Sequence, residues 1–447
     1  MIDTLKPYSE IKDSKSPGLD WIPSHWNVKK LRGLLRVVAS RNRPDLPLLS
    51  VVREKGIILR DVTSKDENHN FIPDDLTNYK VVRSGQFAMN KMKAWQGSYG
   101  VSDYDGIVSP AYYVFDLLDL DDQFFSRAIR SKAYIPFFTS ASDGVRVGQW
   151  DLSKARMRKI PFLIPPRDEQ AAIVKYLDYM DRRIKKLIVA KKKLIKLLEE
   201  QKQAIIHQAV TKGLDPNVSM KDSGVEWPGE VPAHWSVMKL KRLGEVRIGL
   251  IYSPSEVSDQ SGVLVLRASN VKNGEIVNAD NVYVSKRIPN ALFVIEDDIL
   301  ICVRSGSRSL VGKSAIIPPS FAGVTYGAFM SLLRSSINQF LIWVFHSNMF
   351  PRIMAQFETS TINQLTQSDL NNLDIPVPSE LERSNIIDFL QRSTQEIDTT
   401  IAKLKHEISL LSEYYTRLVS DIVTGKLDVR EAAANLPNED TDGGNSP

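Results

Sequence analysis

The sequence predicts an α+β protein in which two globular domains of mixed helix and strand alternate with two long helices. A first observation is a heptad pattern in residues 168–210, where apolar residues recur at alternating spacings of three and four. A second is that the same pattern returns in residues 382–422. A third is that the segments flanking both helices also occur twice, in the same order. The chain therefore contains one domain-and-helix module twice.

The two long helices are predicted from Asp168 to Val210 and from Glu382 to Ile422. The first heptad is interrupted at Lys191 and Gln201, and its apolar positions are Leu177, Met180, Ile184, Leu187, Leu194, Leu198 and Ile205. The second is unbroken, at Ile386, Leu390, Thr394, Ile397, Ile401, Leu404, Ile408, Leu411, Tyr415, Leu418 and Ile422. Because one chain supplies both strands of a coiled coil, self-association through this seam is unnecessary.

Constant shifts relate the borders of the two modules. A shift of 213 residues places Glu169 on Glu382 and residues 211–215 on 424–428, where a glycine suits the left-handed residue that closes a helix. A shift of 209 places His25-Trp26 on His234-Trp235, ahead of each domain. The histidines have no neighbouring ligands at metal-binding spacing. We therefore predict that each tryptophan anchors the chain to its domain.

The segments between these repeats are predicted to be mixed domains. In the first, strands are expected in residues 45–60 and 87–92, and a helix from Asp121 to Lys132. In the second, an Asn273-Gly274 turn predicts a hairpin, residues 298–303 a strand, and Gln339 to Phe357 a helix. The predicted division is a domain at 1–167, a helix at 168–213, a domain at 214–379, a helix at 380–428 and a disordered tail at 429–447.

Length and composition are those of a globular protein with two cores. The chain has 447 residues, 43% of them hydrophobic and 25% charged, and its formal charge of +5 is weak support for a nucleic-acid partner. Cys302, the single cysteine, excludes an intramolecular disulfide and is expected to be a small buried residue in a strand. Since no signal peptide or membrane-spanning segment is apparent, a cytoplasmic protein without membrane contact is expected.

The search for catalytic motifs favours a protein that is not an enzyme. Residues 306–314 resemble a phosphate-binding loop, but five residues separate Gly306 from Gly312 instead of four, and the run after Lys313 has the pattern of a strand. The sequence shows no paired-histidine zinc motif, nucleophile elbow, dinucleotide-binding glycine pattern, adenine-methyltransferase motif or nuclease-like cluster. No metal or cofactor is therefore expected on this chain.

Several polar segments have the composition of DNA-reading loops. Arginine and lysine neutralise phosphates or bind guanine edges, and amide side chains pair with adenine, so loops that mix them are candidates for base recognition. The candidates in the first domain are Lys91, Lys93, Trp95, Gln96, Tyr99 and Arg146. Those in the second domain are Arg267, Ser269, Asn270, Lys272, Arg304, Ser305, Ser307, Arg308 and Lys313. For any one of these residues, a solvated polar loop is the alternative interpretation.

Together these features resemble the specificity subunit of type I restriction-modification enzymes. The resemblance is carried by the proline-containing segment at 160–170, the helix that ends in residues 211–214, the second copy of both, and the two His-Trp pairs. Residues 105–110, 298–301 and 311–315 are similar to stretches of target recognition domains. The second copy departs from the pattern, because Arg383 stands where glutamine is expected after Glu382.

The resemblance implies two target recognition domains in a pseudo-two-fold arrangement, each reading half of a bipartite site in double-stranded DNA. The helices would pack antiparallel as an intramolecular coiled coil, set the spacing of the half-sites and dock two adenine methyltransferase (M) subunits. Restriction/translocase (R) subunits would join that core. S-adenosylmethionine, ATP and Mg would bind the partner subunits. A helix of about 40 residues extends roughly 60 Å, so it spans at most about 18 base pairs.

Other interpretations remain open on the sequence alone. A coiled-coil protein-interaction scaffold without DNA specificity would have the same repeats, but its capture of partners would not depend on DNA. The basic run at 182–196 would face DNA between the half-sites, acidic partner subunits or solvent. An autonomous nucleotide-hydrolysing enzyme rests only on the loop near Lys313.

Overall fold

A computed structural model of the chain describes residues 5–61, 72–144, 150–307, 310–356 and 364–437. The chain divides into two compact units. Unit 1 comprises residues 1–191 and 406–447, and unit 2 comprises residues 192–405. Each of the two long helices therefore contributes residues to both units.

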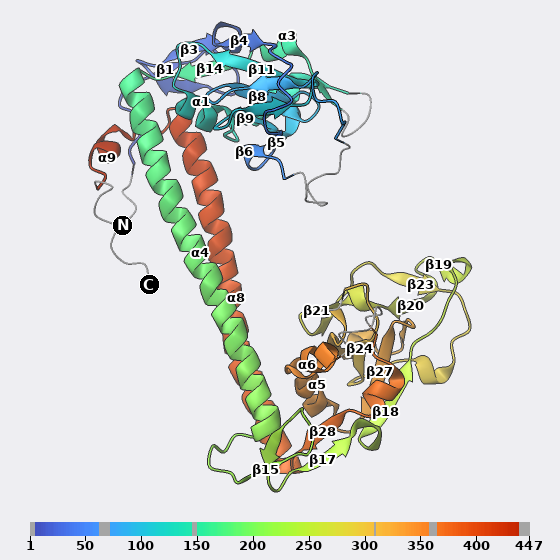
Figure 1. Ribbon diagram of the computed structural model, residues 1–447. Helices are drawn as coiled ribbons and strands as arrows, with labels where there is room; N and C mark the ends of the chain where they lie inside the picture. The colour runs from blue at the N-terminus through green and yellow to red at the C-terminus, as the bar shows by residue number, and fades with distance from the viewer. Residues whose placement is uncertain (1–4, 62–71, 145–149, 308–309, 357–363, 438–447) are drawn as a thin grey trace. The chain divides into compact units, whose positions relative to one another are not determined.

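The centre of unit 1 is an antiparallel four-stranded sheet in the order β4-β11-β8-β9 (Figure 1). Its strands are β4 (Leu35–Val38), β11 (Tyr112–Leu117), β8 (Phe87–Asn90) and β9 (Tyr99–Val101). Successive side chains of a strand point to opposite faces of a sheet. Accordingly, Phe87, Met89 and Phe115 belong to the main hydrophobic core, whereas Ala88 and Val114 belong to a smaller cluster.

Short hairpins and helices surround this sheet. The paired strands are β1 (Ile11–Asp13) with β2 (Trp21–Pro23), β3 (Asn27–Lys30) with β14 (Pro161–Ile164), β5 (Leu49–Val52) with β6 (Gly56–Leu59), β7 (Lys80–Val82) with β10 (Gly106–Val108), and β12 (Ser142–Asp143) with β13 (Asp151–Leu152). The helices are α1 (Asp122–Ile129), α2 (Ile135–Ser140) and α3 (Lys154–Met157). Asp121 caps α1 by accepting a hydrogen bond from the Phe124 backbone NH at 2.7 Å, so this helix begins where it was predicted.

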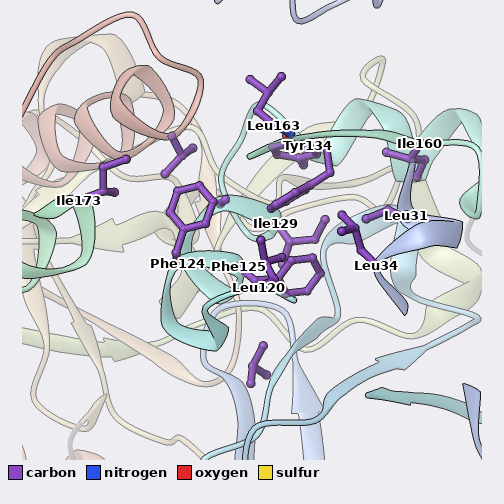
Figure 2. Close-up of a cluster of buried hydrophobic side chains, with 14 of the residues drawn as sticks. Leu31, Leu34, Leu120, Phe124, Phe125, Ile129, Tyr134, Ile160, Leu163 and Ile173 are labelled. Carbon is purple, nitrogen blue, oxygen red and sulfur yellow. The ribbon is translucent and has the colours of Figure 1, made fainter. Parts of the chain in front are cut away.

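The main core of unit 1 joins the globular domain to both long helices. Figure 2 shows Phe124 and Phe125 of α1 within this cluster, with Ile173 next to Phe124. Leu418 and Ile422 belong to the same cluster, although they lie at the far end of the sequence. The N-terminal domain is therefore not complete without the C-terminal part of the chain.

Unit 2 contains an equivalent central sheet in the order β18-β27-β24-β25. Its strands are β18 (Gly244–Ile248), β27 (Met330–Ser335), β24 (Ile299–Cys302) and β25 (Ser314–Ile316). A second sheet contains β19 (Val257–Ser258), β23 (Val282–Val284), β20 (Val263–Leu266) and β26 (Thr325–Tyr326). The remaining pairs are β15 (Met220–Asp222) with β16 (Glu230–Pro232), β17 (Ser236–Lys239) with β28 (Asp374–Val377), and β21 (Val271–Lys272) with β22 (Glu275–Ile276). Cys302 is buried in β24, as predicted, and burial raises the pKa of its thiol.

The turn and helix predictions for unit 2 had different outcomes. Asn273 and Gly274 have positive φ angles of 52° and 80° and connect β21 to β22, which confirms the predicted hairpin. The single helix predicted from Gln339 to Phe357 is wrong, because the region contains α5 (Asn338–His346) and α6 (Met349–Gln356). The Ser347 hydroxyl donates to the Val344 carbonyl at 2.6 Å and accepts from the Met349 NH at 3.3 Å, so it separates the two helices. Phe357 lies outside the described residues, and the short helix α7 spans Gln367–Asn371.

The long helices are α4 (Arg167–Lys212) and α8 (Glu380–Val423), and they run antiparallel against each other (Figure 1). In unit 1, the beginning of α4 is buried with the end of α8. In unit 2, the end of α4 is buried with the beginning of α8. Two ion pairs join the helices, Lys191 with Glu407 at 2.5 Å and Lys202 with Asp398 at 2.6 Å. The predicted intramolecular coiled coil and the predicted α+β fold are confirmed.

The buried face of α4 departs from the predicted heptad. Leu187 and Leu194 are 45% and 44% exposed, whereas the neighbouring Ile195 is buried. Ile206 is buried in place of the predicted Ile205. A straight helix drifts about 20° per heptad from a strict 3.5-residue repeat. A heptad counted from the start of the helix therefore leaves the buried face in its second half.

A buried glutamate in the first turn of α4 holds the first His-Trp pair. The Glu169 carboxylate accepts hydrogen bonds from Trp26 Nε1 at 3.0 Å and from the Tyr8 hydroxyl, and it contacts His25 Nε2 at 2.7 Å. Gly425, which follows α8 with a φ of 75°, lies against the Trp26 ring. The predicted anchoring role of this tryptophan is confirmed.

Unit 2 repeats this arrangement with Glu382 at the start of α8. Its carboxylate is 2.9 Å from both Trp235 Nε1 and His234 Nε2. Gly213, which follows α4 with a φ of 76°, lies against the Trp235 ring. Both helices therefore end on the left-handed glycine that the sequence indicated.

The segment after α8 returns to the N-terminal part of the chain. Asp428 forms a β-bridge with Lys6, and the Arg430 guanidinium lies 5.3 Å from the centre of the Tyr8 ring. Residues Arg430–Ala434 form the helix α9, so this part of the segment predicted to be disordered is helical. Within the described part of the chain, no helix has the length and hydrophobicity needed to span a membrane.

Candidate nucleic-acid interface

In unit 1, the polar residues selected from the sequence gather where β8 ends. Lys91 directly follows this strand, and its ammonium lies 3.0 Å from the Asp151 carboxylate. The ring of Trp95 lies 5.1 Å from that of Trp150. Contacts with the segment around β13 therefore hold this turn in place.

The other candidates of unit 1 lie in different surroundings. Lys93 is exposed and Gln96 is half-buried in the same turn. Tyr99 is fully buried in β9, where its ring lies 4.3 Å from that of Phe138, and burial raises the pKa of its hydroxyl. Tyr99 is thus a core residue in this structure, and we leave it out of the interface. Arg146 lies outside the described residues.

Residues that the sequence analysis missed lie at the same end of the sheet. The ammonium groups of Lys80 and Lys154 lie 5.8 Å and 5.7 Å from the centre of the Tyr113 ring. Lys80 belongs to β7, Lys154 begins α3, and Tyr113 lies on β11 beside β8. Arg41 forms a β-bridge with Lys80. Because these side chains come from four separate segments, no local sequence signal brings them together.

Positive charge is concentrated around Lys80. Burial lowers the pKa of its ammonium, and repulsion by Arg41, Lys154 and Lys91 lowers it further. Such a shift means that the charged form is less favourable here than in water. A bound anion would have the opposite effect on this pKa.

In the first candidate loop of unit 2, Asn270 organises the backbone. Its side-chain amide donates to the carbonyls of Val277 and Ala279 at 3.2 Å and 2.9 Å, and its oxygen accepts from the Arg267 NH at 2.9 Å. It is fully buried, so its amide is not free to pair with adenine. In this structure Asn270 shapes the loop, and DNA contact by its side chain stays a prediction from the sequence.

The remaining residues of this loop are closer to the surface. The Arg267 guanidinium forms an ion pair with Asp280 at 2.6 Å. Ser269 is half-buried, and Lys272 is exposed at the end of β21. This loop follows β20 and therefore starts from the second sheet of unit 2, not from its central sheet.

The second candidate loop of unit 2 follows β24 of the central sheet. The Arg304 guanidinium lies 5.1 Å from the centre of the Phe329 ring, which is 59% exposed. Ser305 and Lys313 are half-buried and Ser307 is exposed, whereas Arg308 lies outside the described residues. A strand, β25, begins directly after Lys313, so the helix that a phosphate-binding loop would open is not formed there.

The two units carry cations and aromatic rings at the same end of equivalent sheets. In unit 1, Tyr112 of β11 pairs with Asn90 at the end of β8. In unit 2, Met330 of β27 pairs with Cys302 at the end of β24. Lys91 and Tyr113 adjoin the first pair, and Phe329 and Arg304 lie next to the second. The same framework thus presents different side chains in the two units.

Comparison with known protein families gives a match in each half of the chain. The model of the type I restriction modification DNA specificity domain matches residues 23–197 and residues 232–410. These matches include both central sheets and most of both long helices.

Individual proteins and solved structures are also similar over long stretches. A protein of Methanocaldococcus jannaschii assigned as the type I restriction enzyme MjaX specificity subunit is 22% identical, over 96% of this chain and 100% of that protein. The type I restriction enzyme EcoKI specificity subunit of Escherichia coli is 25% identical over 44% of each chain. A chain from a structure of a type I R-M system has a TM-score of 0.68 at 17% identity, covering 91% of this chain and 99% of that chain. The HsdS subunit from Thermoanaerobacter tengcongensis has a TM-score of 0.50 at 17% identity, over 92% and 98%.

Proposed function

Since the chain belongs to the family of type I restriction-modification DNA specificity subunits, we propose that each of its two units reads one half of a bipartite DNA target. The observation that carries this proposal is the duplication. Both halves match the specificity-domain model, and both present cations and aromatic rings at the same end of an equivalent sheet. Two copies of one framework with different side chains suit the reading of two different half-sites.

Residues at these sheet ends are our candidates for DNA contact. In unit 1 they are Lys91, Lys93, Trp95 and Gln96, which follow β8. In unit 2 they are Arg304, Ser305, Ser307 and Lys313, with Arg267, Ser269 and Lys272 from the neighbouring loop. Arg146 and Arg308 remain predictions from the sequence.

The coiled coil explains why two readers of limited selectivity suffice. A mismatched base pair costs only about 1–3 kcal/mol, so a domain that reads a few pairs discriminates weakly by itself. Linking two readers multiplies their selectivity when the linker enforces one spacing. We propose that α4 and α8 act as this spacer.

The outer surface of the coil is the proposed docking site for methyltransferase subunits. Leu187, Leu194 and Leu197 are 45%, 44% and 51% exposed on α4, although leucines of a two-helix coil are normally buried in its seam. Exposed apolar residues that recur along one helix are typical of a surface that a partner covers. Two methyltransferase subunits are proposed as these partners, and restriction/translocase subunits would join through them.

We propose that the chain itself catalyses no reaction. Its role would be to select the DNA site, while the partner subunits bind S-adenosylmethionine, ATP and Mg and carry out methyl transfer and restriction. Purified chain should therefore neither methylate DNA nor hydrolyse ATP, and methylation should appear only when the methyltransferase subunit is added. ATP turnover by the chain alone would contradict this assignment.

The function is best tested by sequencing the adenine methylation of genomes with and without the gene. Deletion should abolish methylation at one motif made of two short half-sites separated by a fixed gap, and replacing the gene should restore it. A methylation pattern that is unaffected by deletion would contradict the proposal. Partner capture that is independent of DNA would then favour a protein-interaction scaffold.

A further inference from the structure

At the end of the unit 1 sheet, the ammonium groups of two lysines lie over one aromatic ring, and two further cations lie near one of these lysines. We call this group the Tyr113 cluster. It consists of Arg41, Lys80, Lys91 and Lys154 with the Tyr113 ring. Lys80 also donates a hydrogen bond to the carbonyl of Tyr112. The cluster therefore joins β7, β11, α3 and the turn after β8 at one place in unit 1.

The described part of unit 1 offers this cluster little negative charge. Among the residues that the structure describes, the one carboxylate in an ion pair with these four cations is Asp151, which contacts Lys91 at 3.0 Å. A contact with an aromatic face is worth only about 0.5–1 kcal/mol at an exposed site. The Tyr113 ring thus offsets little of the mutual repulsion of the cations. Bringing them together does not serve the stability of the free protein.

The one amide side chain in the pairing of β8 with β11 is already hydrogen-bonded. The Asn90 side chain is the amide nearest to the cluster in the pairing of β8 with β11. It donates to the Tyr112 hydroxyl at 3.2 Å and accepts from the Met92 NH at 3.0 Å. What remains available is a group of ammonium and guanidinium donors. Such groups are common donors to phosphate oxygens, and a phosphate contact carries no sequence information directly.

We propose that the Tyr113 cluster binds the phosphodiester backbone beside the first half-site and sets the register of unit 1 on the duplex without reading bases. This inference rests on the proposed DNA-reading function and assigns a specific ligand group to Arg41, Lys80 and Lys154, which lie outside the candidate loops, and to Lys91, which begins one of them. The phosphates would supply negative charge beyond that of Asp151.

Unit 2 provides an internal comparison. At the same end of its central sheet, Arg304 is the one cation of the described residues that lies over an aromatic ring. Neutralised phosphates determine how steeply DNA affinity falls with salt. Removing the cations of the Tyr113 cluster should therefore affect the salt dependence more than removing Arg304.

The test replaces Lys80 and Lys154 with glutamine, singly and together, in the full chain assembled with its methyltransferase subunits. Lys12, an exposed lysine on the separate β1–β2 hairpin, is the matched control. Binding is measured by fluorescence anisotropy between 50 and 200 mM salt, on a duplex containing the methylated motif and on a scrambled duplex.

Each cluster substitution should reduce the slope of log affinity against log salt by about 0.9 on both duplexes, which is roughly a 3.5-fold smaller loss of affinity over this salt range. The ratio of the two affinities should not change, and Lys12→Gln should leave the slope unaltered. An unchanged slope in the double variant would overturn the inference. So would a changed affinity ratio, because it would mean that the cluster reads bases.

Separate controls distinguish a folding defect in a variant from a failure of the proposed DNA-reading function. Lys154 makes no hydrogen bond through its ammonium in the described residues, so Lys154→Gln tests the cluster even if Lys80→Gln disturbs β11. A wild-type complex that does not distinguish the two duplexes would refute the proposed function. The salt slopes would still decide whether the cluster binds phosphates.

Discussion

Removing the Glu169 carboxylate should destabilise unit 1 much more than removing Glu382 destabilises unit 2, although the two residues are sequence equivalents. Glu169→Ala leaves Trp26 Nε1 and the Tyr8 hydroxyl without their acceptor. The Glu169 side chain is 1% exposed, so water cannot readily replace it. The Glu382 side chain is 26% exposed, and its partner His234 is 52% exposed. Water can therefore take the place of the second carboxylate.

The expected magnitudes follow from this difference in exposure. An unsatisfied buried donor costs about 1–3 kcal/mol, so two such donors place the cost of Glu169→Ala at about 2–6 kcal/mol. Glu382→Ala leaves one buried donor, Trp235 Nε1, close to solvent, which places its cost at about 1–2 kcal/mol. Glu169→Gln retains one acceptor oxygen and should fall between these values.

Hydrogen exchange followed by mass spectrometry is the suitable assay, because it reports the opening free energy of each unit separately. Glu169→Ala should reduce protection in peptides of β2, β3 and the beginning of α4. Glu382→Ala should produce a smaller loss around β16, β17 and the beginning of α8. Equal losses in the two variants, or a larger loss for Glu382→Ala, would refute the reasoning from burial.

Three further predictions concern acid stability, spacing and partner docking. Burial lowers the pKa of His346 below its ordinary 6.5, and its Nε2 lies 3.1 Å from the Ser314 carbonyl. The stability that the neutral form of this histidine contributes is present above pH 6.5 and is lost as pH falls. The melting temperature should therefore drop less steeply on acidification in the His346→Gln variant than in wild type. Equal dependence of the melting temperature on pH in the two proteins would exclude His346 as the cause of the acid destabilisation. Seven residues inserted in both helices, between Lys191 and Lys202 and between Asp398 and Glu407, lengthen the coil by about 10 Å. Methylome sequencing should then show unchanged half-sites and a gap longer by up to about 3 base pairs, whereas an unchanged gap would count against the spacer role. Leu194→Ser should weaken methyltransferase binding at least about tenfold in titrations, with little change in melting temperature. The control is Ile195→Ser at the buried neighbouring position, which should lower the melting temperature by an amount corresponding to about 2–4 kcal/mol. Unaltered methyltransferase binding by the Leu194→Ser variant would exclude this face of α4 as the docking site.

Periodicity was sufficient to predict the long helices but not which of their residues are buried. The heptad count located α4 and α8 and indicated that one chain supplies both helices of the coil, whereas their antiparallel packing was implied by the family resemblance. The count placed Leu187 and Leu194 in the seam, because the difference between the 3.5-residue heptad period and the period of a straight helix is too small to detect over one or two turns. Over the full helix that difference accumulates, and the burial moves to the neighbouring isoleucine.

The candidate interface was only partly accessible from the sequence. Local composition located the turns after β8 and β24, because polar and basic residues cluster there within a few positions. It could not separate exposed residues from Tyr99 and Asn270, since burial depends on segments that are distant in the sequence. The Tyr113 cluster was missed for the same reason. The repeats did contain a signal for Glu169 as the partner of the first His-Trp pair, since a glutamate and a His-Trp pair both recur in the second module.

The division of unit 1 into residues 1–191 and 406–447 has a consequence for synthesis on the ribosome. Unit 2 is one continuous stretch and is able to close as soon as it emerges. Unit 1 begins earlier, but its core waits for Leu418, Ile422 and Val429. At about 5–20 residues per second, the intervening stretch takes roughly 10–40 s to translate. The domain that is made first is therefore finished last, and a prematurely terminated chain exposes the open core of unit 1 to chaperones and proteases.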